Sequence, residues 1–172
     1  CGMELIDRLP AGERILIFCE RISQAERMFR LLQRKQGSAS CALYHSHMSQ
    51  EARRRNMDAF RDNQARILVS CRCLDEGIDV PDANIGIVLS GSAVERQRIQ
   101  RLGRIIRRAP EKDAACLYYI YIREAAEDRA FLHEIPESRS FDLQYDVREK
   151  DFSNDLYEYA ANDLLYTAKA AG

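Results

Sequence analysis

Short apolar runs recur along the first two thirds of the chain and alternate with segments whose apolar residues are three or four positions apart. A short apolar run bounded by Gly, Pro or polar residues is typical of a strand buried on both faces. Five runs predict five strands, at residues 14–19, 39–45, 66–71, 85–90 and 115–122.

The first segment between these strands has the periodicity of an amphipathic helix. Ser23 followed by Glu26 matches a capping box, which predicts a helix that starts at Ser23 and ends at Gly37. Its inner stripe is expected to consist of Ala25, Met28, Phe29 and Leu32.

A second helix is predicted after residues 39–45. Ser49 is its expected cap, and Phe60 is its expected last residue. The outer face of this helix carries Arg53, Arg54 and Arg55.

Strands that alternate with amphipathic helices predict an α/β fold with a parallel sheet of five or six strands, flanked by helices on both faces. Ligands of such sheets bind beyond the carboxyl ends of the strands. Those ends are Cys19-Glu20, His45-Ser46, Cys71-Arg72, Ser90-Gly91 and Ile122-Arg123.

The pattern changes near residue 134. Residues 134–150 are expected to form an irregular arm, and the apolar spacing in residues 154–168 predicts a helix. We therefore divide the chain into a domain at residues 1–133 and a short, acidic, partly helical extension at residues 134–172.

Charge separates the same two parts. The net charge is −1, but residues 1–110 hold 19 Lys and Arg against 13 Asp and Glu, whereas residues 111–172 hold 7 against 14. A basic body with an acidic tail favours a polyanionic partner for the body.

Six cysteines are present, several of them inside apolar runs, where a reduced cysteine acts as a small core residue. The spacing of Cys71 and Cys73 does not match a structural zinc site, and His45 and His47 lack acidic neighbours, so we expect no metal site. No secretion leader or long apolar segment is evident, which favours a reducing intracellular location, cytoplasmic or nucleoid-associated, with no membrane contact. Because the chain starts at Cys1, we expect it to be a piece of a longer protein.

Residues 95–108 are rich in arginine, yet Ile99, Leu102, Ile105 and Ile106 recur at the spacing of one buried helical stripe. Arginine presents a planar fork of donors that suits phosphate. By itself this helix is either a solvated charged face or an anion-binding surface.

The segment Leu74-Asp75-Glu76-Gly77-Ile78-Asp79-Val80-Pro81 follows a buried strand. A carboxylate in this position accepts hydrogen bonds from a ribose hydroxyl, binds a metal or caps the next turn. The residues alone leave these three roles open.

Four segments in this order resemble the second RecA-like domain of superfamily 2 helicases and related nucleic-acid translocases, over about residues 12–132. Residues 14–19 are similar to the motif IV strand, residues 44–53 to the turn and helix after it, and residues 67–81 to motif V. Residues 100–107 match the motif VI pattern Q/H-R-x-G-R-x-x-R. The resemblance implies a RecA-like fold.

The resemblance also implies roles for residues in this divided site. Arg104 and Arg107 would be arginine fingers that reach the γ-phosphate of ATP held by a partner domain. Nucleotide binding would involve Gly77, Asp79 and Gln100. Contacts with the nucleic-acid backbone would come from Cys19, Ser46, Cys71 and Arg72, although the family usually has Thr in place of Cys71 and often Gly in place of Ser46.

The P-loop pattern G-x-x-x-x-G-K-[ST] does not occur in this sequence, so ATP and Mg²⁺ are expected to be held mainly by an N-terminal RecA-like domain. We predict the second motor half of a helicase or translocase, directed to DNA in preference to RNA and inactive as an ATPase without that partner domain. The alternative is a non-catalytic RecA-like module that binds nucleic acid or protein. A dinucleotide-binding enzyme is disfavoured because no G-x-G-x-x-G turn follows the first strand.

Overall fold

The computed structural model describes residues 2–37, 40–71, 83–89, 116–121, 140–146, 151–152 and 167–171. The helices in these ranges are α1 (Gly2–Arg8), α2 (Ile22–Gln36) and α3 (Gln50–Arg61). The strands are β1 (Ile15–Cys19), β2 (Cys41–His45), β3 (Ile67–Cys71), β4 (Ile85–Leu89), β5 (Cys116–Tyr121), β6 (Ser140–Asp146), β7 (Asp151–Phe152) and β8 (Thr167–Ala171).

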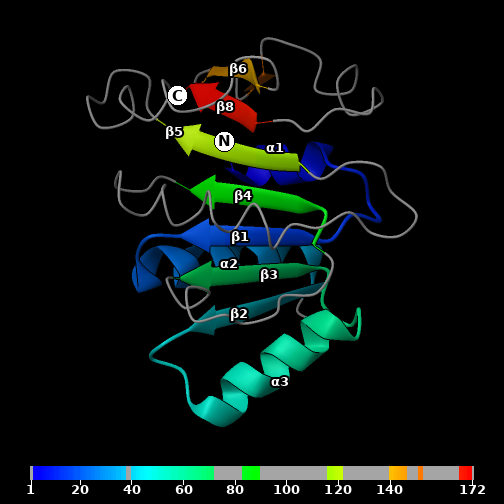
Figure 1. The fold of residues 1–172 in the computed structure, drawn as a ribbon, viewed down its shortest axis with the longest axis vertical. Helices are drawn as coiled ribbons and strands as arrows, with labels where there is room; N and C mark the ends of the chain where they lie inside the picture. The colour runs from blue at the N-terminus through cyan, green and yellow to red at the C-terminus, as the bar shows by residue number, and fades with distance from the viewer. Residues whose placement is uncertain are drawn as a thin grey trace.

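All described strands join one sheet in the order β2-β3-β1-β4-β5-β8-β6-β7 (Figure 1). Neighbouring strands from β2 to β6 run parallel, whereas β6 and β7 are antiparallel. Each of the five predicted strands is present within its predicted range. The parallel sheet expected from the sequence is therefore confirmed.

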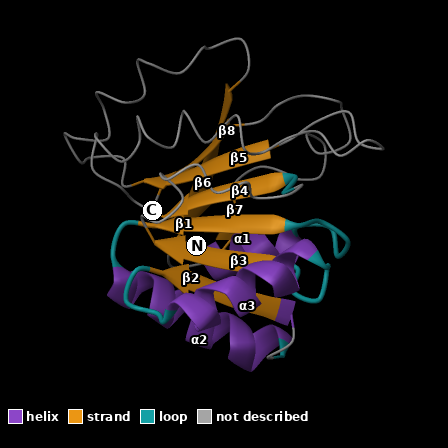
Figure 2. Cartoon of the chain, turned by 60° about the horizontal axis from the view of Figure 1, so that its bottom comes forward, coloured by secondary structure: helices purple, strands orange, loops and turns teal. Residues whose placement is uncertain are grey.

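Strand β1 is buried along its whole length and packs on both faces. Ile15, Ile17 and Cys19 belong to a core with α1 and α2, whereas Leu16 and Phe18 belong to a second core with α3. This alternation is the two-residue period of a strand. Helices therefore cover both faces, as predicted. Figure 2 shows α2 and α3 beside β2 and β3, whereas Figure 1 shows α1 level with β4 and β5.

The predicted capping box of Ser23 and Glu26 is wrong. Helix α2 begins at Ile22, with Arg21 at the N-cap position and no side-chain cap. Ile22 packs against the core, which extends the helix beyond the start that local capping chemistry suggested. Gly37, at a φ of 87°, ends the helix as predicted.

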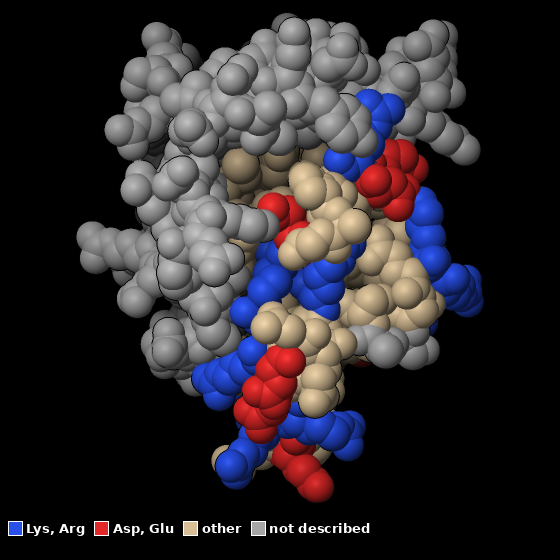
Figure 3. Space-filling model, turned by 90° about the vertical axis from the view of Figure 1, so that its right-hand side faces the viewer, with Lys and Arg blue, Asp and Glu red and all other residues tan. Residues whose placement is uncertain are grey.

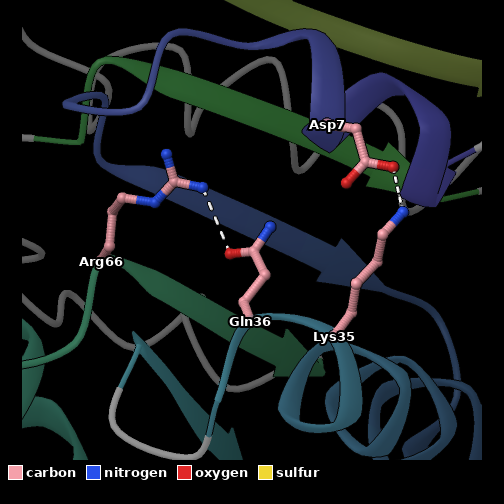
Figure 4. A network of polar contacts seen from close by, with 4 residues as sticks. All are labelled: Asp7, Lys35, Gln36 and Arg66. Carbon is pink, nitrogen blue, oxygen red and sulfur yellow. Dashed lines mark hydrogen bonds and ion pairs between the residues drawn. The ribbon is translucent and has the colours of Figure 1, made fainter.

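Helix α1 is not among the elements predicted from the sequence. Leu5 and Ile6 are buried in the same core as α2. An ion pair between Asp7 of α1 and Lys35 of α2 joins the two helices on the surface (Figure 4). This short helix is thus stabilised mainly by tertiary packing, since a helix of 7 residues is marginal by itself.

The amino-terminal edge of the sheet is held together by arginines. Arg14 donates to the carbonyl oxygen of Phe60 and lies 4.4 Å from the centre of its ring. Arg66 donates to the carbonyl oxygen of Pro10 at 3.2 Å and to Oε1 of Gln36 at 3.3 Å (Figure 4). Figure 3 views this edge, where basic side chains lie beside acidic ones. The positive charge here serves contacts within the fold.

The sheet is longer than predicted, because the extension at residues 134–172 contributes β6, β7 and β8 to it. Strand β8 pairs in parallel with the outer side of β5. This pairing gives partners to backbone groups that an edge strand leaves exposed. Thr167 and Ala168, predicted as the end of a helix, are in β8, which corrects that part of the prediction. Residues 154–166 lie outside the described ranges.

Replacement of Ser49 by Ala is expected to lower the free energy of unfolding by about 0.5–2 kcal/mol. The Ser49 hydroxyl accepts a hydrogen bond from the amide of Ala52 at 3.2 Å, and the variant leaves that amide unpaired. Ser23→Ala is the matched control, because Ser23 is exposed and lies inside α2 rather than at its cap. Urea denaturation measures the free energy of unfolding of both variants. A larger loss of this free energy in Ser23→Ala than in Ser49→Ala would support the predicted capping box.

Candidate functional site

The carboxyl ends of four strands lie in one row. In the register of the sheet, His45 of β2 pairs with Cys71 of β3, Cys71 with Cys19 of β1, and Cys19 with Leu89 of β4. The topology therefore brings together the ends of four of the five strands that the sequence analysis proposed as a ligand-binding edge.

The two cysteines of this row are buried in the core that contains α2. The exposed fraction is 5% for Cys19 and 2% for Cys71. Burial, with a smaller contribution from Cys71, raises the pKa of the Cys19 thiol to about 12, so this thiol stays protonated. Cys71 Sγ donates to the carbonyl oxygen of Glu20 at 3.4 Å. Both side chains therefore serve contacts within the fold.

His45 is a buried imidazole at the end of β2. Its Nε2 lies 3.7 Å from Oε1 of Glu26 on α2, and its Nδ1 has no hydrogen-bond partner among the described residues. Burial lowers the pKa of His45, the neighbouring His47 lowers it further, and Glu26 raises it. The ring is therefore neutral at pH 7.

The turn after β2 exposes Ser46 and His47 to solvent. The amide of Met48 donates to the carbonyl oxygen of His45 at 3.2 Å, and Ser49 then starts α3 as predicted. Of the three described residues that were predicted to contact nucleic acid, Ser46 is exposed, whereas Cys19 and Cys71 are buried.

The arginines at the start of α3 differ in exposure. Arg54 and Arg55 are exposed, as predicted, and Arg54 lies 3.9 Å from Asp58. Arg53 is half-buried, and its Nε has no hydrogen-bond partner among the described residues. The side chain of Asn56, one turn on, donates to the carbonyl oxygen of Leu43 at 2.8 Å and so joins α3 to β2.

The described part of the chain holds no group of three His, Cys, Asp or Glu side chains arranged to bind a metal ion. Its four cysteines, Cys19, Cys41, Cys71 and Cys116, are free thiols. None of the described helices has the length and apolar character needed to cross a membrane.

The sequence model of the helicase conserved C-terminal domain matches residues 2–109. The chain belongs to the helicase conserved C-terminal domain family. The match spans strands β1 to β4 and includes the arginine pattern at residues 100–107. The resemblance to the C-terminal RecA-like domain of superfamily 2 helicases is thereby confirmed.

The relatives of this helicase C-terminal domain include proteins named as DNA translocases and proteins named as RNA helicases. The chain is 40% identical over 72 residues to the DNA 3'-5' translocase XPB2 of Sulfurisphaera tokodaii, which covers 42% of this chain and 16% of the relative. It is 30% identical over 107 residues to the ATP-dependent RNA helicase dbp3 of Aspergillus terreus, which covers 62% of this chain and 21% of the relative. The chain thus spans less than a quarter of either relative.

Solved structures agree on the fold. The C-terminal domain of the DEAD-box protein Dbp5 gives a TM-score of 0.61 at 15% identity, covering 98% of this chain and 81% of that chain. The Hef helicase domain of Pyrococcus furiosus gives 0.58 at 17% identity, covering 78% of this chain and 28% of that chain. These similarities establish the RecA-like architecture alone.

Six residues singled out in the sequence lie outside the described ranges, so their roles stay predictions. They are Arg72, Gly77, Asp79, Gln100, Arg104 and Arg107. Sequence reasoning also missed two side chains at this edge, Gln24 and Glu26, which face the ends of other strands. Their position in the first turns of the helix after β1 is the signal that could have identified them.

His45 is expected to titrate below the ordinary pKa of 6.5 in NMR spectra of its ring protons, because burial disfavours the imidazolium. Glu26→Gln removes the attractive carboxylate and should lower the pKa of His45 further. His47→Asn removes a repulsive neighbour and should raise it. Since the folded pKa is depressed, the contribution of His45 to stability is complete above pH 6.5 and is lost as the pH falls through the folded value.

The Glu26→Gln spectrum decides whether this contact exists in solution. A pKa of His45 that rises or stays the same in that variant contradicts the contact between His45 and Glu26. Acid unfolding, followed by circular dichroism, provides the stability readout.

Proposed function

We propose that this chain is the second motor domain of an ATP-dependent helicase or translocase, and that it supplies arginine fingers to a site shared with an N-terminal RecA-like domain. The observation that supports this most directly is the family match over residues 2–109, which includes the complete pattern Q-R-x-G-R-x-x-R. A domain that served only as a scaffold has no need of two arginines at this spacing.

In the proposed site, Arg104 and Arg107 stabilise the charge that spreads over the equatorial oxygens of the transferred phosphoryl group. Gln100 lies near the phosphates, and Asp79 accepts a hydrogen bond from the ribose while Gly77 permits close approach. Mg²⁺ would be held mainly by the N-terminal domain and would neutralise phosphate charge there. The isolated chain is inactive in this scheme.

The nucleic-acid track in this proposal follows the carboxyl edge of the sheet. Its members are the exposed turn at Ser46, the backbone at Cys19 and Cys71, and the side chain of Arg72. The alignment of His45, Cys71 and Cys19 in one row of strand ends supports the track, because contacts to successive phosphates need donors spaced along a line. The reduced, buried thiols support an intracellular location, cytoplasmic or nucleoid-associated.

Arg104→Ala and Arg107→Ala should each reduce nucleic-acid-stimulated ATP hydrolysis by about a thousandfold or more, because arginine fingers contribute about that much to the rate. The variants are measured in the chain joined to its N-terminal partner domain. Arg34→Ala is the control, since Arg34 is exposed on α2 and its side chain forms no hydrogen bond or ion pair with other described residues. Full activity in both finger variants contradicts the assignment.

DNA should stimulate ATP hydrolysis by this motor more strongly than RNA of the same sequence and length. The preference for DNA over RNA is based on the Leu-Asp-Glu-Gly-Ile-Asp-Val-Pro segment and on Gln100. It is also based on the identity to a DNA translocase, which is higher than the identity to an RNA helicase. Initial rates at saturating single-stranded DNA, duplex DNA and RNA provide the comparison. A higher rate with RNA would place the chain with the RNA helicases that it also resembles.

A further inference from the structure

One side chain connects the ends of two strands at the carboxyl edge. Gln24, the third residue of α2, accepts a hydrogen bond from the backbone amide of Glu20 at 3.2 Å through Oε1. Its Nε2 donates to the carbonyl oxygen of Leu89 at 3.3 Å. Glu20 directly follows β1, and Leu89 is the last residue of β4, so a single amide joins the exits of both strands.

The peptide group at Glu20 is also held from β3. Its carbonyl oxygen accepts the hydrogen bond from Cys71 Sγ at 3.4 Å. Glu20 is thereby linked to β3 through its carbonyl oxygen and to β4 through its amide and Gln24. We call the group of Glu20, Gln24, Cys71 and Leu89 the exit clamp.

The exit clamp needs the chemistry of a glutamine. A carboxamide offers a donor and an acceptor at the same time, whereas a carboxylate only accepts and a thioether forms neither bond well. Gln24 is half-buried and rooted in the first turn of a helix that packs against the core. Its two hydrogen bonds are therefore held in a fixed geometry. A displacement of one strand exit strains the hydrogen bond to the other strand exit.

We propose that Gln24 is a positioning residue that couples the exit of β1, on the nucleic-acid track, to the exit of β4, which leads into the arginine segment. This inference rests on the function proposed above. A nucleic-acid strand that contacts the backbone after β1 shifts Glu20, and Gln24 transmits the shift to Leu89. The chain continues from Leu89 into residues 90–108, which carry Arg104 and Arg107.

Two variants separate the bonds of the exit clamp. Gln24→Met keeps the length of the side chain and removes both hydrogen bonds. Gln24→Glu keeps the bond from the Glu20 amide and removes the one to Leu89. Gln33→Met is the matched control, because Gln33 is a half-buried glutamine of the same helix whose side chain bonds to no other described residue.

The decisive measurement is the ratio of nucleic-acid-stimulated to basal ATP hydrolysis, in the chain joined to its N-terminal partner domain. Both Gln24 variants should lower this ratio at least about fivefold, the lower end of typical coupling between sites. Gln33→Met should retain the wild-type ratio. A purely structural role lowers both rates together through the folded fraction and leaves the ratio unchanged, so an unchanged ratio in Gln24→Met overturns the coupling.

Amide hydrogen exchange of the 172-residue chain tests the clamp without reference to ATP. Exchange at Glu20 should be at least about fivefold faster in Gln24→Met, as loss of one hydrogen bond implies, and slow in Gln24→Glu. Unchanged exchange in Gln24→Met shows that the clamp does not form. If the wild-type motor shows no stimulation by nucleic acid, the motor function and the coupling fail together, whereas the exchange result still decides the clamp.

Discussion

Burial of β1 on both faces is the constraint on which the rest of the structure depends. Its side chains alternate between a core with α1 and α2 and a core with α3, so neither helical layer can shift without exposing apolar surface. The same strand pairs with β3 on one side and β4 on the other. The exits of these strands are consequently held in one row, and this row is the candidate track.

Both edges of the sheet carry polar side chains among the described residues. At the amino-terminal edge, Arg14 and Arg66 bond to carbonyl oxygens of the fold itself. At the carboxyl edge, the described residues leave His45 Nδ1 and Arg53 Nε without a partner and expose the turn at Ser46. The exposed turn at Ser46 is the described part of the carboxyl edge that a ligand can reach.

Buried thiols explain how a helicase C-terminal domain can carry cysteine at the ends of β1 and β3. Cys19 and Cys71 are small enough to sit between strands and α2, and the high pKa of Cys19 keeps its thiol neutral and unreactive. The Cys71 thiol also holds the carbonyl oxygen of Glu20. The backbone of Cys71 pairs in register with Cys19 of β1.

The sequence by itself determined the five core strands, the start of α3, the end of α2 and the family, because each depends on local patterns: apolar runs, the Ser49 cap, Gly37 and the arginine spacing. Only the tertiary structure decided where α2 begins, that α1 forms, and that residues 167–171 continue the sheet, since long-range packing and strand pairing override weak local preferences there. The tertiary structure also decided that the exit clamp forms. Glu20 and Leu89 are 69 positions apart in the chain, and no local pattern indicates that one glutamine bonds to both.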